Sequence, residues 1–270
     1  MSTLPSLKDR VVTVRDLFLK NQDAIKSALP KHMTVDRMIR VAFTCINTTP
    51  KLLDCSPRSL LAAVLQCAQL GLEPGNTLGH VYLVPFENRK KNIVEVQIIP
   101  GYRGLIKLAR NTREISTVLA QEVFPADTFS YQFGTDPKIA HVPGKWGSLS
   151  ERGEAIGYYA VMRLKDGGTM FDVMSRQEVE AHRDRYSRAA KQGPWVTEFD
   201  EMAKKTVLRK VCKLGPQSIE LQTAVALDER AEVQLPQELP DVVDPLDEPY
   251  SAEASSKLDQ LADQVAGTTA

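Results

Sequence analysis

The chain has 270 residues, of which 34 are basic and 34 acidic, so its formal net charge is zero. Its composition, 43% hydrophobic and 25% charged, is that of a soluble globular protein and excludes a fibrous or wholly disordered chain. No stretch approaches the roughly 18 apolar residues of a membrane span, and the first residues lack an apolar signal core. We therefore expect a cytoplasmic protein whose four widely spaced cysteines are reduced thiols (Cys45, Cys55, Cys67 and Cys212).

The neutral total hides a separation of charge along the chain. Residues 226–270 hold 11 acidic and two basic side chains, a net charge of −9, which leaves +9 on residues 1–225. The proline-rich acidic end is too polar to offset its ordering entropy, so we predict a disordered tail over residues 229–270. Such a tail either docks other proteins, competes with nucleic acid for the basic surface, or only keeps the chain soluble.

Apolar spacing predicts a helical N-terminal segment, residues 1–55, with helices over residues 10–29 and 34–48. This segment is a candidate for self-assembly. A third helix follows, because Ser56 fits an N-cap, Pro57 fits the first turn and Gly71 fits the C-terminal cap. Residues 56–228 are expected to form the core of the protein.

Within the core the apolar period changes to that of strands, which alternate with helices in chain order. Strands are predicted at residues 80–86, 93–99, 115–124, 128–133, 155–164 and 169–174, and helices at 105–110, 175–187 and 198–214. Ser175 and Glu178 form a capping box for the second of these helices, and Gly215 with Pro216 stops the third. Strands joined mainly as hairpins and flanked by helices indicate an α+β fold with an antiparallel sheet, not a doubly wound one.

Motifs of the common enzyme classes are absent, including the phosphate-binding loop, the dinucleotide glycine motif, the nucleophile elbow and H-E-x-x-H. The histidines are scattered without metal-ligand spacing (His32, His80, His141 and His182). A lone histidine is more often a hydrogen-bonded structural residue. The sequence thus predicts no catalytic site and no metal site, and leaves a nuclease built from converging carboxylates as the alternative.

The last strong helix of the core carries basic residues at four-residue spacing, Lys205, Arg209 and Lys213, which places them in one stripe. After its first turn this helix has five basic residues and no acidic one, whereas a merely solvated face usually mixes signs. We predict that the stripe contacts phosphates. Lys204 and Lys210 lie nearer the flanks and either serve the same groove or extend over the core.

A second cationic cluster is interspersed with the glycine pair Gly101 and Gly104 and consists of Tyr102, Arg103, Lys107 and Arg110. Its glycines permit close backbone approach, its helix N-terminus offers N–H groups to an anion, and its aromatic ring suits base stacking. The alternative is that the glycines only make a strand-to-helix turn.

Three further features bear on these clusters. Pro100 precedes the glycine pair and, having no N–H, favours an early end of the strand. The loop residues 89–91 are basic, yet exposed loops favour lysine in any case. Trp195 is expected in the core or at a subunit contact.

Several segments occur in the order found in one family. They are Ala28–Thr34 with Arg37–Arg40, Gln66–Gly75, Leu78–Phe86, Gly101–Arg110, Arg163–Gly168, and Gly193–Thr197 leading into Glu201–Thr206. Over about residues 25–228 the chain resembles the RecT family of phage and prophage single-strand annealing recombinases.

The resemblance implies a protein that binds single-stranded DNA and pairs it with a complementary strand without ATP or another required cofactor, with Mg²⁺ as a modulator of binding. It also implies assembly into rings or helical filaments and cooperation with a 5′-to-3′ exonuclease of the RecE type. The acidic tail is a candidate dock for the host single-stranded-DNA-binding protein or for the nuclease. The rival functions are a module that only coats single strands and, less favoured, a metal-dependent nuclease.

Overall fold

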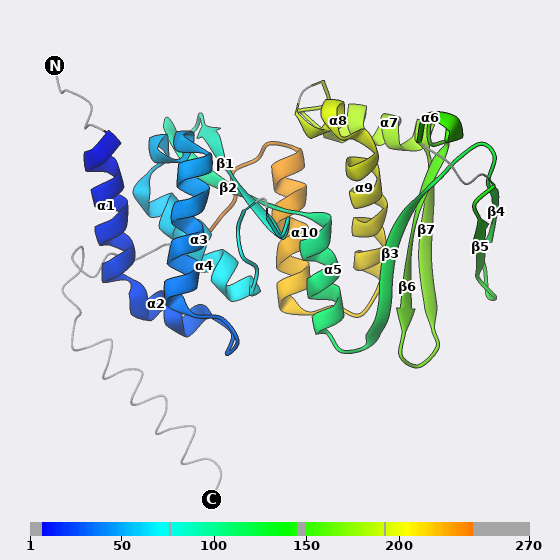
Figure 1. Ribbon diagram of the computed structural model, residues 1–270, viewed down its shortest axis with the longest axis horizontal. Helices are drawn as coiled ribbons and strands as arrows, with labels where there is room; N and C mark the ends of the chain where they lie inside the picture. Colours follow the sequence, from blue (N-terminus) through cyan, green and yellow to red (C-terminus); the bar gives the residue numbers. More distant parts are fainter. Residues whose placement is uncertain (1–6, 76, 145–148, 192, 240–270) are drawn as a thin grey trace, which may run out of the picture. The chain divides into compact units, whose positions relative to one another are not determined.

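The structure is a computed structural model that describes residues 7–75, 77–144, 149–191 and 193–239 (Figure 1). The helices in chain order are α1 (Leu7–Lys20), α2 (Gln22–Ala28), α3 (Val35–Thr48), the 3-10 helix η1 (Pro50–Asp54), α4 (Pro57–Leu70), α5 (Tyr102–Asn111), α6 (Leu149–Arg152), α7 (Arg176–Tyr186), α8 (Pro194–Thr197), α9 (Phe199–Leu214) and α10 (Ile219–Glu232). The strands are β1 (Val81–Asn88), β2 (Ile93–Pro100), β3 (Ile115–Val123), β4 (Thr128–Gln132), β5 (Lys138–Val142), β6 (Gly157–Leu164) and β7 (Thr169–Ser175). All strand pairs between these elements are antiparallel, so the predicted α+β class is confirmed. No helix in the described ranges combines the length and apolarity needed to cross a bilayer.

The N-terminal helices follow the sequence prediction with one break. The helix expected over residues 10–29 is two helices, α1 and α2, separated at Asn21. Helix α4 has the predicted caps, because the Ser56 hydroxyl accepts from the Ser59 N–H and Gly71 adopts a left-handed conformation with φ 64°. Its apolar body is buried along most of its length. Ala-rich packing of this kind lets the neighbouring hairpin approach closely.

That hairpin is formed by β1 and β2, which pair from Val81 opposite Pro100 to Asn88 opposite Ile93. Pro100 therefore does not shorten the strand, because its missing N–H lies at the last pair of the ladder. Strand β2 packs against α4 and α10.

A separate three-stranded sheet has the order β3-β6-β7, and α9 packs against it (Figure 1). The central strand β6 is buried on both of its faces over Gly157–Met162. On one face the Tyr158 ring lies edge-on to Phe199 of α9, and on the other Tyr159 is stacked by Phe129 of β4 at 5.3 Å between ring centroids. Strand β5 is not predicted, since its two large apolar residues, Ile139 and Val142, are three positions apart in the sequence, which is not the spacing of a strand.

The largest difference from the prediction lies at the boundary of the acidic tail. Residues 229–239 belong to the same compact unit as the core: α10 continues to Glu232, and a following segment, residues 233–239, lies along β2. We call residues 233–239 the strap. Its Gln237 side chain donates to the Ile98 carbonyl at 2.6 Å and accepts from the Ile98 N–H at 2.7 Å, as a neighbouring strand would. A tail boundary at residue 229 is therefore too early, and the remaining predicted tail, residues 240–270, lies outside the described residues.

Candidate nucleic-acid interface

Two of the three cations in the predicted α9 stripe, Lys205 and Arg209, are buried. The side chains of Lys205 and Arg209 are only 10% and 8% exposed, because α9 packs against the β3-β6-β7 sheet on one side and against α10 on the other. A phosphate contact requires a cation that reaches solvent. The structure therefore places neither side chain where a phosphate would reach it, in contrast to the predicted stripe.

Lys205 and Arg209 are held by carboxylates of α10. Asp228 accepts from Lys205 and, at 2.8 Å, from Arg209, which also donates to Glu232 at 2.5 Å. Burial opposes ionisation of Glu232, but the hydrogen bond from His182 and the charge of Arg209 hold its pKa at about 2. The network joins α7, α9 and α10. Its two cations are balanced by its two carboxylates, so neither cation is available to bind a phosphate.

The other basic residues of α9 are also paired with carboxylates. Lys204 contacts Glu122 at 2.8 Å and Glu201 at 2.7 Å. Lys210 lies 2.8 Å from Asp172, and Lys213 pairs with Glu229. None of the five cations of α9 is thus free of a counterion, although Lys210 and Lys213 remain half exposed.

Gly101 and Gly104, at the start of α5, make room for the chain's own backbone. A Cβ at Gly101 would meet the carbonyl oxygen of Gly79, and one at Gly104 would meet that of His80. The Gly101 N–H donates to the His80 carbonyl at 2.9 Å. The space beside the two glycines is therefore filled by the backbone of residues 79–80. This arrangement fits the alternative interpretation, in which the glycines only make a strand-to-helix turn.

Lys107 is engaged by a contact within the chain, whereas Arg110 stays exposed. Lys107 donates to the Gly71 carbonyl at 2.8 Å, where it compensates the C-terminal end of α4, and burial lowers its pKa. Arg110 is exposed and has no ion pair within the described ranges, and a separation of seven residues places it on the same side of α5 as Arg103, about 10 Å farther along the helix.

Tyr102 and Arg103 remain as a solvent-facing pair, and the structure adds Tyr82 to them. Arg103 donates to the Tyr102 hydroxyl at 3.3 Å and lies 5.8 Å from the centre of its ring. The Tyr82 ring lies in contact distance of a Cβ at Gly101, and both Tyr82 and Arg103 border Gly79. Tyr82 was not singled out from the sequence, although its place in an alternating strand could have indicated an outward side chain.

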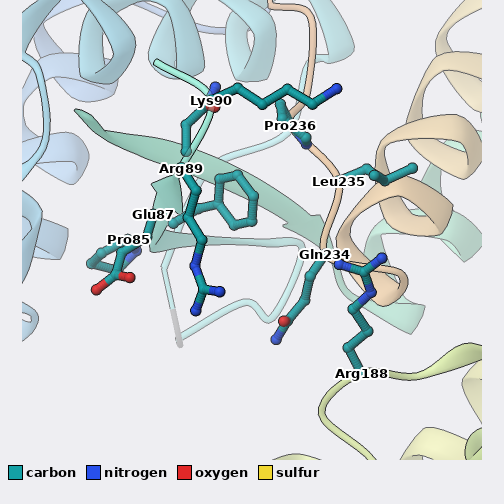
Figure 2. A pocket seen from close by; sticks show the side chains of 10 residues that line it. Pro85, Glu87, Arg89, Lys90, Arg188, Gln234, Leu235 and Pro236 are labelled. Carbon is teal, nitrogen blue, oxygen red and sulfur yellow. The ribbon is translucent and has the colours of Figure 1, made fainter. Parts of the chain in front are cut away.

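A second cationic surface lies at the tip of the β1–β2 hairpin. An open pocket of about 740 Å³ is lined by one set of residues, Pro85–Lys90, Arg188 and Gln234–Pro236. Figure 2 shows Arg89 and Gln234 pointing into the same opening, with Arg188 directed toward them from the loop after α7. Within the described ranges Arg89, Lys90 and Arg188 have no ion pair, whereas Lys91 contacts Glu95 at 3.1 Å. We call this site the hairpin pocket.

The remaining candidates from the sequence are structural. Trp195 is 3% exposed and packs near Phe199, which confirms a core position. All four cysteines are buried free thiols. His141 lies between the Tyr159 hydroxyl at 3.1 Å and the Asp127 carboxylate at 2.9 Å, where it fastens β5 to β6.

Comparison with known proteins agrees with the resemblance read from the sequence. The family model described as the RecT family matches residues 36–241. Protein RecT of Escherichia coli (strain K12) is 48% identical over 211 residues, which are 77% of this chain and 77% of that protein. The chain belongs to the RecT family of single-strand annealing recombination proteins.

Proposed function

We propose that the protein pairs complementary single strands of DNA by an ATP-independent, non-enzymatic route, as an assembly of many copies. The observation that carries this proposal is the family match over residues 36–241. Cations neutralise the phosphates of two strands and lower their repulsion, while base pairing supplies the sequence specificity. Stacking contributes about 1.4 kcal/mol per base step, so the protein needs no code for bases.

The start of α5 is the better candidate for the DNA contact than α9. Arg103 is exposed and has no carboxylate within ion-pair distance among the described residues, whereas the cations of α9 are all paired. Tyr102 and Tyr82 lie beside it and offer rings on which bases can stack, at about 1–3 kcal/mol per base. We assign phosphate binding to Arg103 and stacking to the two tyrosines.

The wider assignments rest on the resemblance and on the charge pattern. Residues 1–55 are the candidate for self-assembly into rings or filaments, and a 5′-to-3′ exonuclease of the RecE type is the candidate partner in a bacterial cytoplasm. The acidic residues beyond 239 are the candidate dock for that nuclease or for the host single-stranded-DNA-binding protein. Capture of either partner by the full chain, but not by a chain that ends after Leu239, would support this dock; equal capture by both would refute it.

The function is tested by annealing of two labelled complementary oligonucleotides without ATP. The wild type is expected to accelerate pairing, and Arg103→Ala to slow it several-fold. Lys165→Ala removes another exposed cation, from the β6–β7 turn, and is expected to match the wild type. Strand protection with slower pairing would instead identify a coating module, and loss of labelled DNA in magnesium would identify a nuclease.

A further inference from the structure

One face of β1 presents a row of apolar side chains to solvent. Because strand side chains alternate, Tyr82, Val84 and Phe86 share this face, while Val81 and Leu83 point into the core. Tyr82 is 36% exposed and Val84 37%. We call Tyr82, Val84 and Phe86 the β1 row.

The strap covers the middle of the neighbouring strand β2 at Gln97 and Ile98 but leaves the β1 row open. Gln97 is paired with Val84 across the hairpin, so the two side chains lie on the same face. Gln97 is nevertheless 5% exposed, because its amide donates to the Leu235 carbonyl of the strap at 3.0 Å. Beside Val84 the exposed apolar surface is therefore one strand wide.

Unpaired cations stand at both ends of the β1 row. At its Tyr82 end, Arg103 borders the same glycine as the tyrosine ring. At its Phe86 end lies the hairpin pocket, which Phe86 itself lines. Arg89, Lys90 and Arg188 line the same pocket (Figure 2). Glu87 is the acidic side chain of that lining, so positive charge predominates. An apolar row that ends in cations on both sides is complementary to a chain that alternates flat bases with phosphates.

We propose that the β1 row is a track for one single strand of nucleic acid, which runs from Arg103 to the hairpin pocket. Bases lie against Tyr82, Val84 and Phe86, and the phosphates at the two ends are bound by Arg103 and by Arg89 with Arg188. Four residues of strand rise about 13 Å, which is the length of about four stacked bases at 3.4 Å each. This track rests on the proposed function and adds the hairpin pocket, to which neither the sequence nor the family match gives a role.

Charge favours this occupant over a second copy of the chain. Arginine guanidinium groups bind phosphate in a bidentate manner, and Gln234 adds an amide donor to the same opening. A protein partner that covers only an apolar strand would leave these cations desolvated and unpaired, which is costly.

The track is tested with a tryptophan placed on it in the full-length chain. Val84→Trp puts an indole at the centre of the β1 row, and Thr117→Trp puts one at an exposed site of β3 as a matched control. Oligothymidylate is expected to quench the emission at position 84 by stacking and to leave the emission at position 117 unchanged. If DNA binds and the emission of neither variant changes, the track is refuted. A concentration-dependent change at position 84 without DNA would assign the face to a second copy instead.

The pocket end is tested by the salt dependence of binding to the same oligonucleotide. For single strands each phosphate contact contributes about 0.7 to the slope of log affinity against log salt concentration. Arg89→Ala/Arg188→Ala is therefore expected to reduce the slope by about 1.4, whereas Lys165→Ala is expected to leave it unchanged. An unchanged slope in the double variant, with tight binding by the wild type, refutes the pocket alone. Failure of the wild type to bind refutes the proposed function.

Discussion

The Arg209 guanidinium of α9 donates to the Asp228 carboxylate of α10 at 2.8 Å, and both side chains are more than nine-tenths buried. Asp228 also accepts from Lys205, so one carboxylate serves two buried cations. This arrangement converts a set of charges that resembled a DNA-binding stripe into a joint between two helices.

Removing this carboxylate is expected to destabilise the protein strongly. Asp228→Asn leaves Lys205 and Arg209 buried with one counterion too few, and breaking a buried pair in this way costs about 3–5 kcal/mol. Urea unfolding followed by circular dichroism measures the loss. Glu238→Gln breaks the exposed pair with Arg230, in which Glu238 is 86% exposed, and should cost less than about 1 kcal/mol. Similar losses in the two variants would contradict a structural role of the buried pair.

Glu232 is expected to make stability depend on pH in the acid range. Its pKa is about 2 in the folded protein and near 4.5 when unfolded, so its contribution is present above about pH 5 and is lost as the pH falls toward 2. Glu232→Gln should be less stable than the wild type at pH 7, by on the order of 3 kcal/mol. The difference should shrink steadily when unfolding is measured at pH 5, 4 and 3. A difference that stays constant would show that Glu232 is not held ionised.

The two glycines at the start of α5 give a steric prediction. Gly101→Ala and Gly104→Ala each place a Cβ against backbone oxygens of residues 79–80, which cannot move as a side chain can. We expect each to lose about 1–3 kcal/mol or more, although alanine favours the helix at position 104. Gly157→Ala is the control, because its Cβ would lie 3.3 Å from the Met174 carbonyl. Denaturation midpoints of the three variants should therefore rank Gly157→Ala as the mildest.

The cysteines are expected to resist modification in the folded protein. Burial raises the pKa of Cys55 and of Cys212 to about 12, so neither supplies a thiolate near neutral pH. A colourimetric disulfide reagent should label the native protein slowly and label four thiols quickly in denaturant. Rapid labelling of any thiol in the native state would show that its segment opens readily.

The sequence predicted elements well where local chemistry decides them. The caps of α4 and the capping box of α7, Ser175 with Glu178, are set by neighbouring residues and appear as predicted. Helix α10 was missed because its acidic residues were counted with a disordered tail. In the sequence nothing assigns a partner to three carboxylates of this helix, Asp228, Glu229 and Glu232. Only the packing of α10 on α9 shows that they are counterions of the α9 cations.

The candidate site shows the same limit. A four-residue spacing places Lys205, Arg209 and Lys213 on one side of a helix, but it does not say whether that side faces solvent or another helix. Arg103 could be singled out as a candidate from the sequence because the glycines and the aromatic residue beside it are its neighbours in the chain. The hairpin pocket, in contrast, combines segments that are about 50 and 100 residues apart in the chain. Such a combination depends on tertiary contacts that carry no local signal.

The amide of Gln237 determines how far the chain can be shortened. A protein that ends after Leu239 keeps the side chain that occupies the N–H and carbonyl of Ile98. A protein that ends before Gln237 exposes those two groups at the edge of the two-stranded β1–β2 sheet, where the backbone of another chain can pair with them. Cleavage after Gln237 therefore leaves the edge of β2 covered, whereas cleavage before Gln237 leaves a chain that is prone to aggregate through this edge.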